Sequence, residues 1–63
     1  MIENNIRNYL KQYGGCGPSS GFLLERIGEK YELRTTRWTI AYVLQYYFTT
    51  NNLPVEVIPC QKL

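Results

Sequence analysis

Apolar residues recur at helical spacing in three segments of the chain. The first stripe has the spacing i, i+4, i+7, i+8 and i+11, which places its members on one face of a helix: Ile2, Ile6, Tyr9, Leu10 and Tyr13. Glu3 and Arg7 add an i, i+4 pair with the acid toward the N-terminus. The pattern predicts a helix over residues 2–13, ended by Gly14 in a left-handed conformation.

A second helix is predicted over residues 21–33. Its apolar stripe consists of Leu23, Leu24, Ile27 and Tyr31, and its opposite face mixes charges of both signs. Gly28 lies in the middle of this segment, where glycine is about 1 kcal/mol less favourable than alanine in a helix. The glycine-rich residues 14–21 lack the Lys-Ser or Lys-Thr of a phosphate-binding loop, so we expect an ordinary connection there.

A third helix is predicted over residues 36–49, with Thr35 or Thr36 as its N-cap. Its apolar stripe consists of Ile40, Leu44, Tyr47 and Phe48. The segment Arg34-Thr35-Thr36-Arg37 interrupts the apolar pattern, and two helices separated by only about three residues form a helix-turn-helix. Alternating β-branched residues within 53–59 then predict a strand, which its prolines confine to a sheet edge. The sequence therefore predicts one domain, residues 1–63, that is mostly α-helical with a small β element.

The charge balance is mildly basic. Seven Lys or Arg stand against five Glu, for a formal net charge of +2 and a pI of about 8.7. That pI is below the value of about 9 that marks a nucleic-acid-binding domain, so the placement of the charges has to decide. No apolar run fits a secretory signal or a transmembrane helix. We therefore expect a soluble cytoplasmic protein with no membrane partner.

The sequence offers little for catalysis or metal binding. It contains no His and no Asp, and two cysteines, Cys16 and Cys60, do not complete a zinc shell. We expect no enzyme activity, no metal, no cofactor and no small-molecule substrate. A Cys16–Cys60 bridge would close a loop of about 45 residues and stabilise the fold by roughly 4 kcal/mol. The alternative is two free thiols in a reducing cytosol.

The outward face of the third predicted helix is the most informative surface. It carries no acidic residue and combines aromatic with hydrogen-bonding side chains: Arg34, Thr35, Trp38, Thr39, Tyr42, Gln45 and Tyr46. Arg34 and Arg37, near the helix N-terminus, could contact phosphates, while Thr and Gln side chains could reach base edges. These features predict double-stranded DNA as the partner. The alternative is that Trp38 and Tyr42, at i and i+4, pack in the core or at a dimer contact.

The predicted elements resemble the winged helix-turn-helix family of DNA-binding domains. The resemblance covers residues 2–58 and consists of three helices, a short turn, a Thr/Arg-led third helix and a trailing strand. It implies a transcription regulator whose third helix enters the major groove, with a wing over residues 48–58. The wing tip, Asn51 and Asn52, departs from the family pattern because it has no Lys or Arg. The small solitary domain also resembles regulators encoded by viruses and plasmids.

Residue by residue, the resemblance places six residues on or near the recognition helix: Thr35, Thr36, Arg37, Trp38, Thr39 and Tyr42. Arg34 and Gln45 complete the predicted DNA-binding set. The resemblance also implies that Cys16 and Cys60 are close enough to bridge, and paired half-sites imply a homodimer. The competing hypothesis is a protein-interaction or dimerisation module anchored by the aromatic side chains of the third helix.

Overall fold

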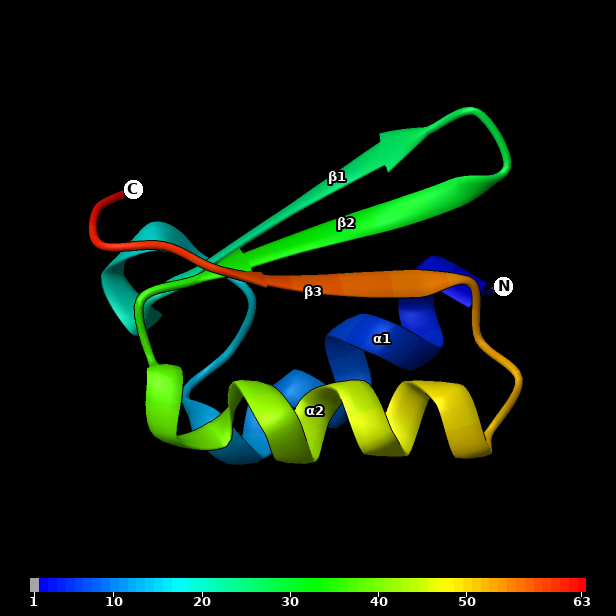
Figure 1. Ribbon diagram of the computed structural model, residues 1–63, viewed down its shortest axis with the longest axis horizontal. Helices are drawn as coiled ribbons and strands as arrows, with labels where there is room; N and C mark the ends of the chain where they lie inside the picture. Colours follow the sequence, from blue (N-terminus) through cyan, green and yellow to red (C-terminus); the bar gives the residue numbers. More distant parts are fainter. Residues whose placement is uncertain (1) are drawn as a thin grey trace.

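A computed structural model describes residues 2–63, which form two α-helices, two short 3-10 helices and a three-stranded sheet (Figure 1). In chain order the elements are α1 (Ile2–Leu10), η1 (Lys11–Tyr13), η2 (Pro18–Ser20), β1 (Phe22–Ile27), β2 (Lys30–Thr35), α2 (Trp38–Thr50) and β3 (Val55–Pro59). The expectation of a mostly α, three-helix winged helix-turn-helix domain is therefore wrong. The chain folds as a small α/β domain.

The predicted second helix is a β-hairpin. Phe22 pairs with Thr35 and Ile27 with Lys30 across antiparallel strands β1 and β2, leaving a two-residue loop. Gly28 opens this loop at φ +64°, and glycine at the first central position is typical of a type II′ hairpin turn. The glycine that weakens a helix is thus the residue that allows the chain to reverse.

The wing is also absent from residues 48–58. These residues hold the end of α2, a turn and β3, and β3 pairs in parallel with β2 rather than forming a hairpin. Parallel pairing requires a crossover, and α2 supplies it. Since strand β2 precedes α2, residues 21–49 contain no helix-turn-helix.

Three of the predicted elements are confirmed. The helix predicted over residues 2–13 corresponds to α1 continued by η1, with Gly14 left-handed at φ +107°. The helix predicted over residues 36–49 corresponds to α2. The predicted strand corresponds to β3, and the strand order β1-β2-β3 places it on an edge.

Both α-helices lie on one side of the sheet, and the core fills the space between them (Figure 1). Its fully or almost fully buried residues are Ile6, Leu10, Phe22, Leu33, Leu44, Phe48 and Val55. Aromatic contacts join the two helices, because the rings of Tyr9 and Tyr47 stack with centroids 3.6 Å apart and planes 6° from parallel. The other side of the sheet remains uncovered by these helices (Figure 1).

Candidate functional site

Helix α2 has no charged residue among its thirteen, Trp38–Thr50. Ala41, Leu44 and Phe48 are buried, and Leu44 and Phe48 belong to the core cluster that includes residues of the sheet and of α1. A helix that lies on the surface normally carries charged and polar residues on the side opposite its buried stripe. In α2 the side opposite the buried stripe carries no charged residue.

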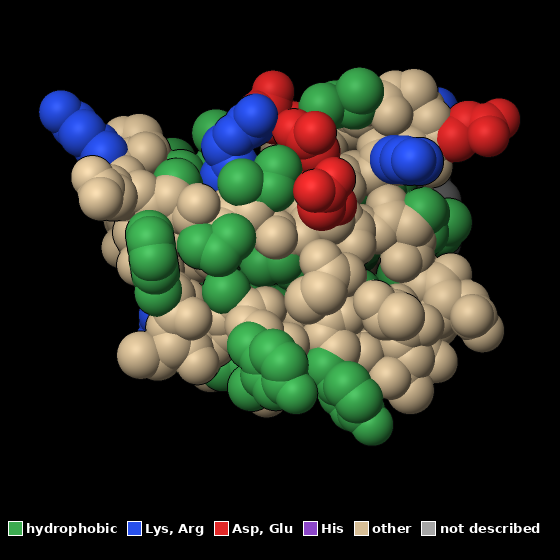
Figure 2. All heavy atoms as spheres, in the orientation of Figure 1, with side chains coloured by type: hydrophobic (Ala, Val, Ile, Leu, Met, Phe, Trp, Pro, Cys, Tyr) green, Lys and Arg blue, Asp and Glu red, His purple; other side chains and the backbone are tan. Residues whose placement is uncertain are grey.

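The solvent-facing side of α2 is aromatic. Trp38, Tyr42 and Tyr46 follow each other at i, i+4 and i+8 and are 57%, 80% and 68% exposed. Val43 beside them is 45% exposed, and Thr39 is exposed as well. We call these five residues the aromatic face of α2. Figure 2 shows most Lys, Arg and Glu side chains over the sheet, while the surface over α2 is largely hydrophobic or uncharged.

The side of α2 next to β3 holds that strand in place. The Gln45 side-chain amide donates from Nε2 to the Val55 carbonyl at 3.0 Å, and its Oε1 accepts from the Val57 backbone N–H at 2.8 Å. Trp38 Nε1 donates to the Cys60 carbonyl at 2.8 Å. The indole therefore has a fixed orientation although more than half of its surface faces solvent. Sequence reasoning missed this role of Gln45, because its partners are more than nine residues away.

The structure separates the predicted DNA-binding residues. Trp38, Thr39 and Tyr42 lie together on α2, and Thr36 is exposed just before that helix. Thr35, however, belongs to β2 and is fully buried, where its Oγ1 accepts the Arg37 backbone N–H at 3.0 Å. Thr35 therefore belongs to the interior.

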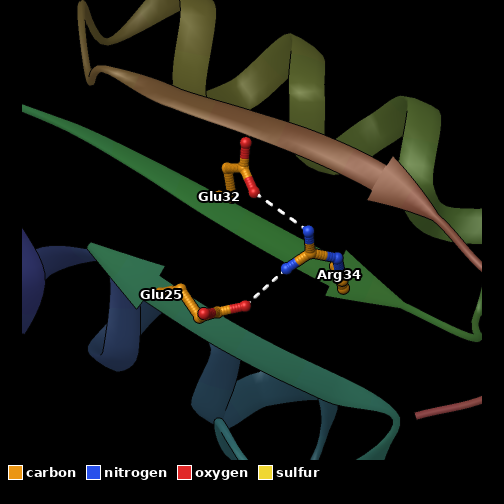
Figure 3. A network of polar contacts seen from close by, with 3 residues as sticks. All are labelled: Glu25, Glu32 and Arg34. Carbon is orange, nitrogen blue, oxygen red and sulfur yellow. Dashed lines mark hydrogen bonds and ion pairs between the residues drawn. The ribbon is translucent and has the colours of Figure 1, made fainter. Parts of the chain in front are cut away.

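Both arginines of this set are engaged within the chain. Arg37 donates from Nη1 to the Tyr13 carbonyl at 2.6 Å, and its guanidinium lies 5.7 Å from the Phe22 ring centroid. Arg34 lies on the open side of the sheet, where it pairs with Glu25 on β1 and, at 3.2 Å, with Glu32 on its own strand (Figure 3). The guanidinium of Arg34 thus faces two carboxylates and lies on a different surface from the aromatic face.

Both cysteines of the described chain are free thiols. The Cys60 backbone N–H bonds to the Thr35 carbonyl at 2.8 Å, just beyond the end of β3. Cys16 packs against the core, and burial raises the pKa of its thiol, with Glu3 adding to the shift and Arg7 opposing it. A raised pKa keeps Cys16 in the thiol form, which is the unreactive one.

Pockets lie beside the hairpin end and between the two α-helices. One, of about 300 Å³, lies between the hairpin end and the start of β3 and is lined by Ile27, Lys30, Tyr31, Glu32, Leu53, Pro54, Val55 and Glu56. Another, of about 310 Å³, is lined by Asn5, Asn8, Tyr9, Tyr47, Asn51 and Leu53. Burial, followed by the neighbouring Tyr13 and Tyr47, raises the pKa of Tyr9 to about 12, so the phenol stays neutral.

Within residues 2–63 no group of three or more His, Cys, Asp or Glu could hold a metal ion. In the same residues no helix is long and apolar enough to cross a membrane.

Comparison with family models, curated proteins and solved structures finds no match to this chain. Trp38, Thr39, Tyr42 and Tyr46 all belong to the outward face that the sequence predicts, which carries no acidic residue. Val43 was the member missed, because its spacing also places it at the margin of the buried stripe.

Proposed function

We propose that this chain is a protein-interaction module whose binding surface is the aromatic face of α2. The observation that carries the proposal is the row of Trp38, Tyr42 and Tyr46, exposed on a helix that has no charged residue. Trp and Tyr are enriched among the residues that dominate binding energy at protein interfaces. They offer large apolar contact area with little side-chain entropy to lose.

The charge distribution favours protein over DNA as the partner. A DNA-binding helix needs cations beside it to neutralise phosphates. Arg34 instead lies on the open side of the sheet between two glutamates, and Arg37 donates to the Tyr13 carbonyl. Gln45, the predicted base-reading side chain, bonds to β3. The aromatic face therefore retains contact area and the Thr39 hydroxyl, but it has no cation for phosphates, and the Gln45 amide is already bonded to β3.

Site-specific photocrosslinking tests the proposal. A photoreactive benzophenone amino acid replaces Tyr42, which is exposed and aromatic, and the variant is expressed in the cells in which the protein naturally occurs. The matched control carries the same group at Ile27, which is 52% exposed at the hairpin end. We expect protein adducts from position 42 and not from position 27. Nucleic-acid adducts, or none at all, from position 42 would contradict the proposal.

A DNA titration provides an independent check. The purified protein is titrated onto labelled random duplex DNA at about 50 and 200 mM salt, where phosphate-driven binding changes steeply. We expect no binding at micromolar protein in either condition. Binding that collapses at the higher salt would favour the DNA hypothesis instead.

A further inference from the structure

We infer, on the basis of the function proposed above, that the partner on the aromatic face is α2 of a second copy of this chain. The two helices run antiparallel, and a twofold axis passes beside Tyr42.

The absence of charge makes the face compatible with itself. A twofold interface brings the same patch of both copies together, so any charge near the axis meets its own like charge. Helix α2 carries none over its full length. A charged partner surface would find no charge to pair with on α2. The α2 surface of a second copy is uncharged as well, so the two surfaces have the same polarity.

The spacing of the rings fits the twofold arrangement. Residues four apart on a helix are separated by about 6 Å along its axis, so the three rings form an evenly spaced row about 12 Å long. Tyr42 is the centre of that row. When two such rows lie antiparallel, Tyr42 faces its counterpart, and Trp38 faces the partner subunit's Tyr46. The row is therefore complementary to itself.

The area available agrees with a modest dimer. An aromatic side chain contributes about 150–250 Å², so three rings at these exposures offer roughly 300–500 Å² per copy. Val43 and Thr39 lie beside them and widen the patch. A standard interface buries about 800 Å² per partner, and weak complexes bury less. Because a chain of this size has a small core, association would also stabilise the fold.

Charge swapping at position 42 tests the twofold directly. Tyr42→Lys and Tyr42→Glu each place like charges at the axis, and the side chain is 80% exposed, so neither change touches the core. Sedimentation equilibrium is measured from about 1 µM to 1 mM, which spans weak to moderate dimers. We expect the wild type to approach twice the 7.4 kDa of one chain. Each variant alone stays monomeric, and the equimolar mixture regains the dimer mass.

The control variant is Ile27→Lys, which adds the same charge at an exposed apolar position away from α2 and should dimerise like the wild type. A second readout needs no variant, since Trp38 is the chain's one tryptophan. Dilution of the wild type should shift its emission to the red as the indole becomes exposed to water. An emission spectrum that does not change across the dimer–monomer transition would overturn the inference.

The outcomes separate this inference from the proposed function. A wild type that stays monomeric to 1 mM, while position 42 crosslinks to a different protein, overturns the second copy and leaves the interaction function standing. No protein adduct at position 42 overturns both. A dimer that survives Tyr42→Lys, or variants that do not recombine, would overturn the twofold beside Tyr42.

Discussion

The contribution of Gln45 to the stability of the fold can be predicted from its contacts. Strand β3 lies on the edge of the sheet, and its outward backbone groups have no neighbouring strand. The primary amide of Gln45 meets two of them, donating to the Val55 carbonyl and accepting from the Val57 N–H. The amide makes the two hydrogen bonds that a peptide group of a neighbouring strand would make, and it thereby attaches β3 to α2.

Replacing Gln45 with Ala removes an exposed hydrogen bond to Thr49 Oγ1, at 3.2 Å, and both hydrogen bonds to β3. Each bond to β3 is worth about 0.5–1.5 kcal/mol net, so the free energy of unfolding should fall by about 1–3 kcal/mol. For a domain of this size each kcal/mol lowers Tm by roughly 4–8 °C. The loss is substantial because a chain this short has only about 3–5 kcal/mol of core stability to draw on.

Urea unfolding followed by circular dichroism measures the change. The matched control is Gln12→Ala, which also removes a side-chain amide bond to a backbone carbonyl, that of Tyr9, but at an exposed position. We expect the control to stay within about 0.5 kcal/mol of the wild type. A Gln45→Ala protein equally close to the wild type would refute the reasoning that Gln45 anchors β3.

Gln45→Glu refines the same test. The carboxylate still accepts from the Val57 N–H, but it has no donor for the Val55 carbonyl. We expect the variant to be less stable than the wild type at neutral pH. The deficit should shrink as the pH falls through the carboxyl pKa, near 4 or somewhat higher, because the protonated acid regains a donor. A deficit that does not change with pH would mean that the Val55 contact contributes nothing.

Three further predictions concern single positions. Gly21→Ala should lower the free energy of unfolding by more than Gly28→Ala in a urea comparison: both glycines have positive φ, but only the Gly21 Cβ would meet another atom, the Thr36 Oγ1 at 2.8 Å. The pKa of Tyr9 is raised to about 12, so its stabilising contribution is full below pH 10.0 and is lost as the pH rises toward 12; wild-type stability should fall relative to Tyr9→Phe over that interval. Burial raises the pKa of Cys16, so its alkylation by iodoacetamide should be slower at pH 8 than that of an unfolded control, and equal rates would contradict the burial.

The hairpin is where sequence-based prediction failed, and the reason is local. An inward and outward alternation is present, with Phe22, Leu33 and Thr35 buried. It is obscured because the apolar Leu23 and Ile27, which are 37% and 52% exposed, share the open side of the sheet with Glu25. The apolar residues Leu23, Leu24, Ile27 and Tyr31 also have the spacing of a helical stripe, so the pattern fits a helix as well as a strand. The turn itself is Gly-Glu, which lacks the Asn-Gly or Asp-Gly of the strongest hairpin signal.

The helices were predictable because their buried stripes are long and regular. Helix α1 buries Ile6 and Leu10 and α2 buries Leu44 and Phe48, each pair four residues apart. The same pattern does not determine the function of α2. Whether Gln45 and Arg34 are available to a ligand depends on Val55, Val57 and Glu25, residues distant in sequence that only the sheet brings near. Periodicity identifies which face of a helix is buried, but it does not identify partners from other elements.

The open side of the sheet and the aromatic face of α2 differ in how well their side chains are already satisfied by contacts within the chain. On the open side of the sheet, Arg34 lies between Glu25 and Glu32, so these three charged groups form an ion-paired network that is already favourable in water and has one negative charge in excess (Figure 3). On α2, Tyr42 and Tyr46 leave most of their ring area in water with no polar network to offset it. Removing apolar area from water is favourable by about 25 cal/mol per Å². The driving force for association is therefore concentrated on α2, which is the physical reason to look for the partner there first.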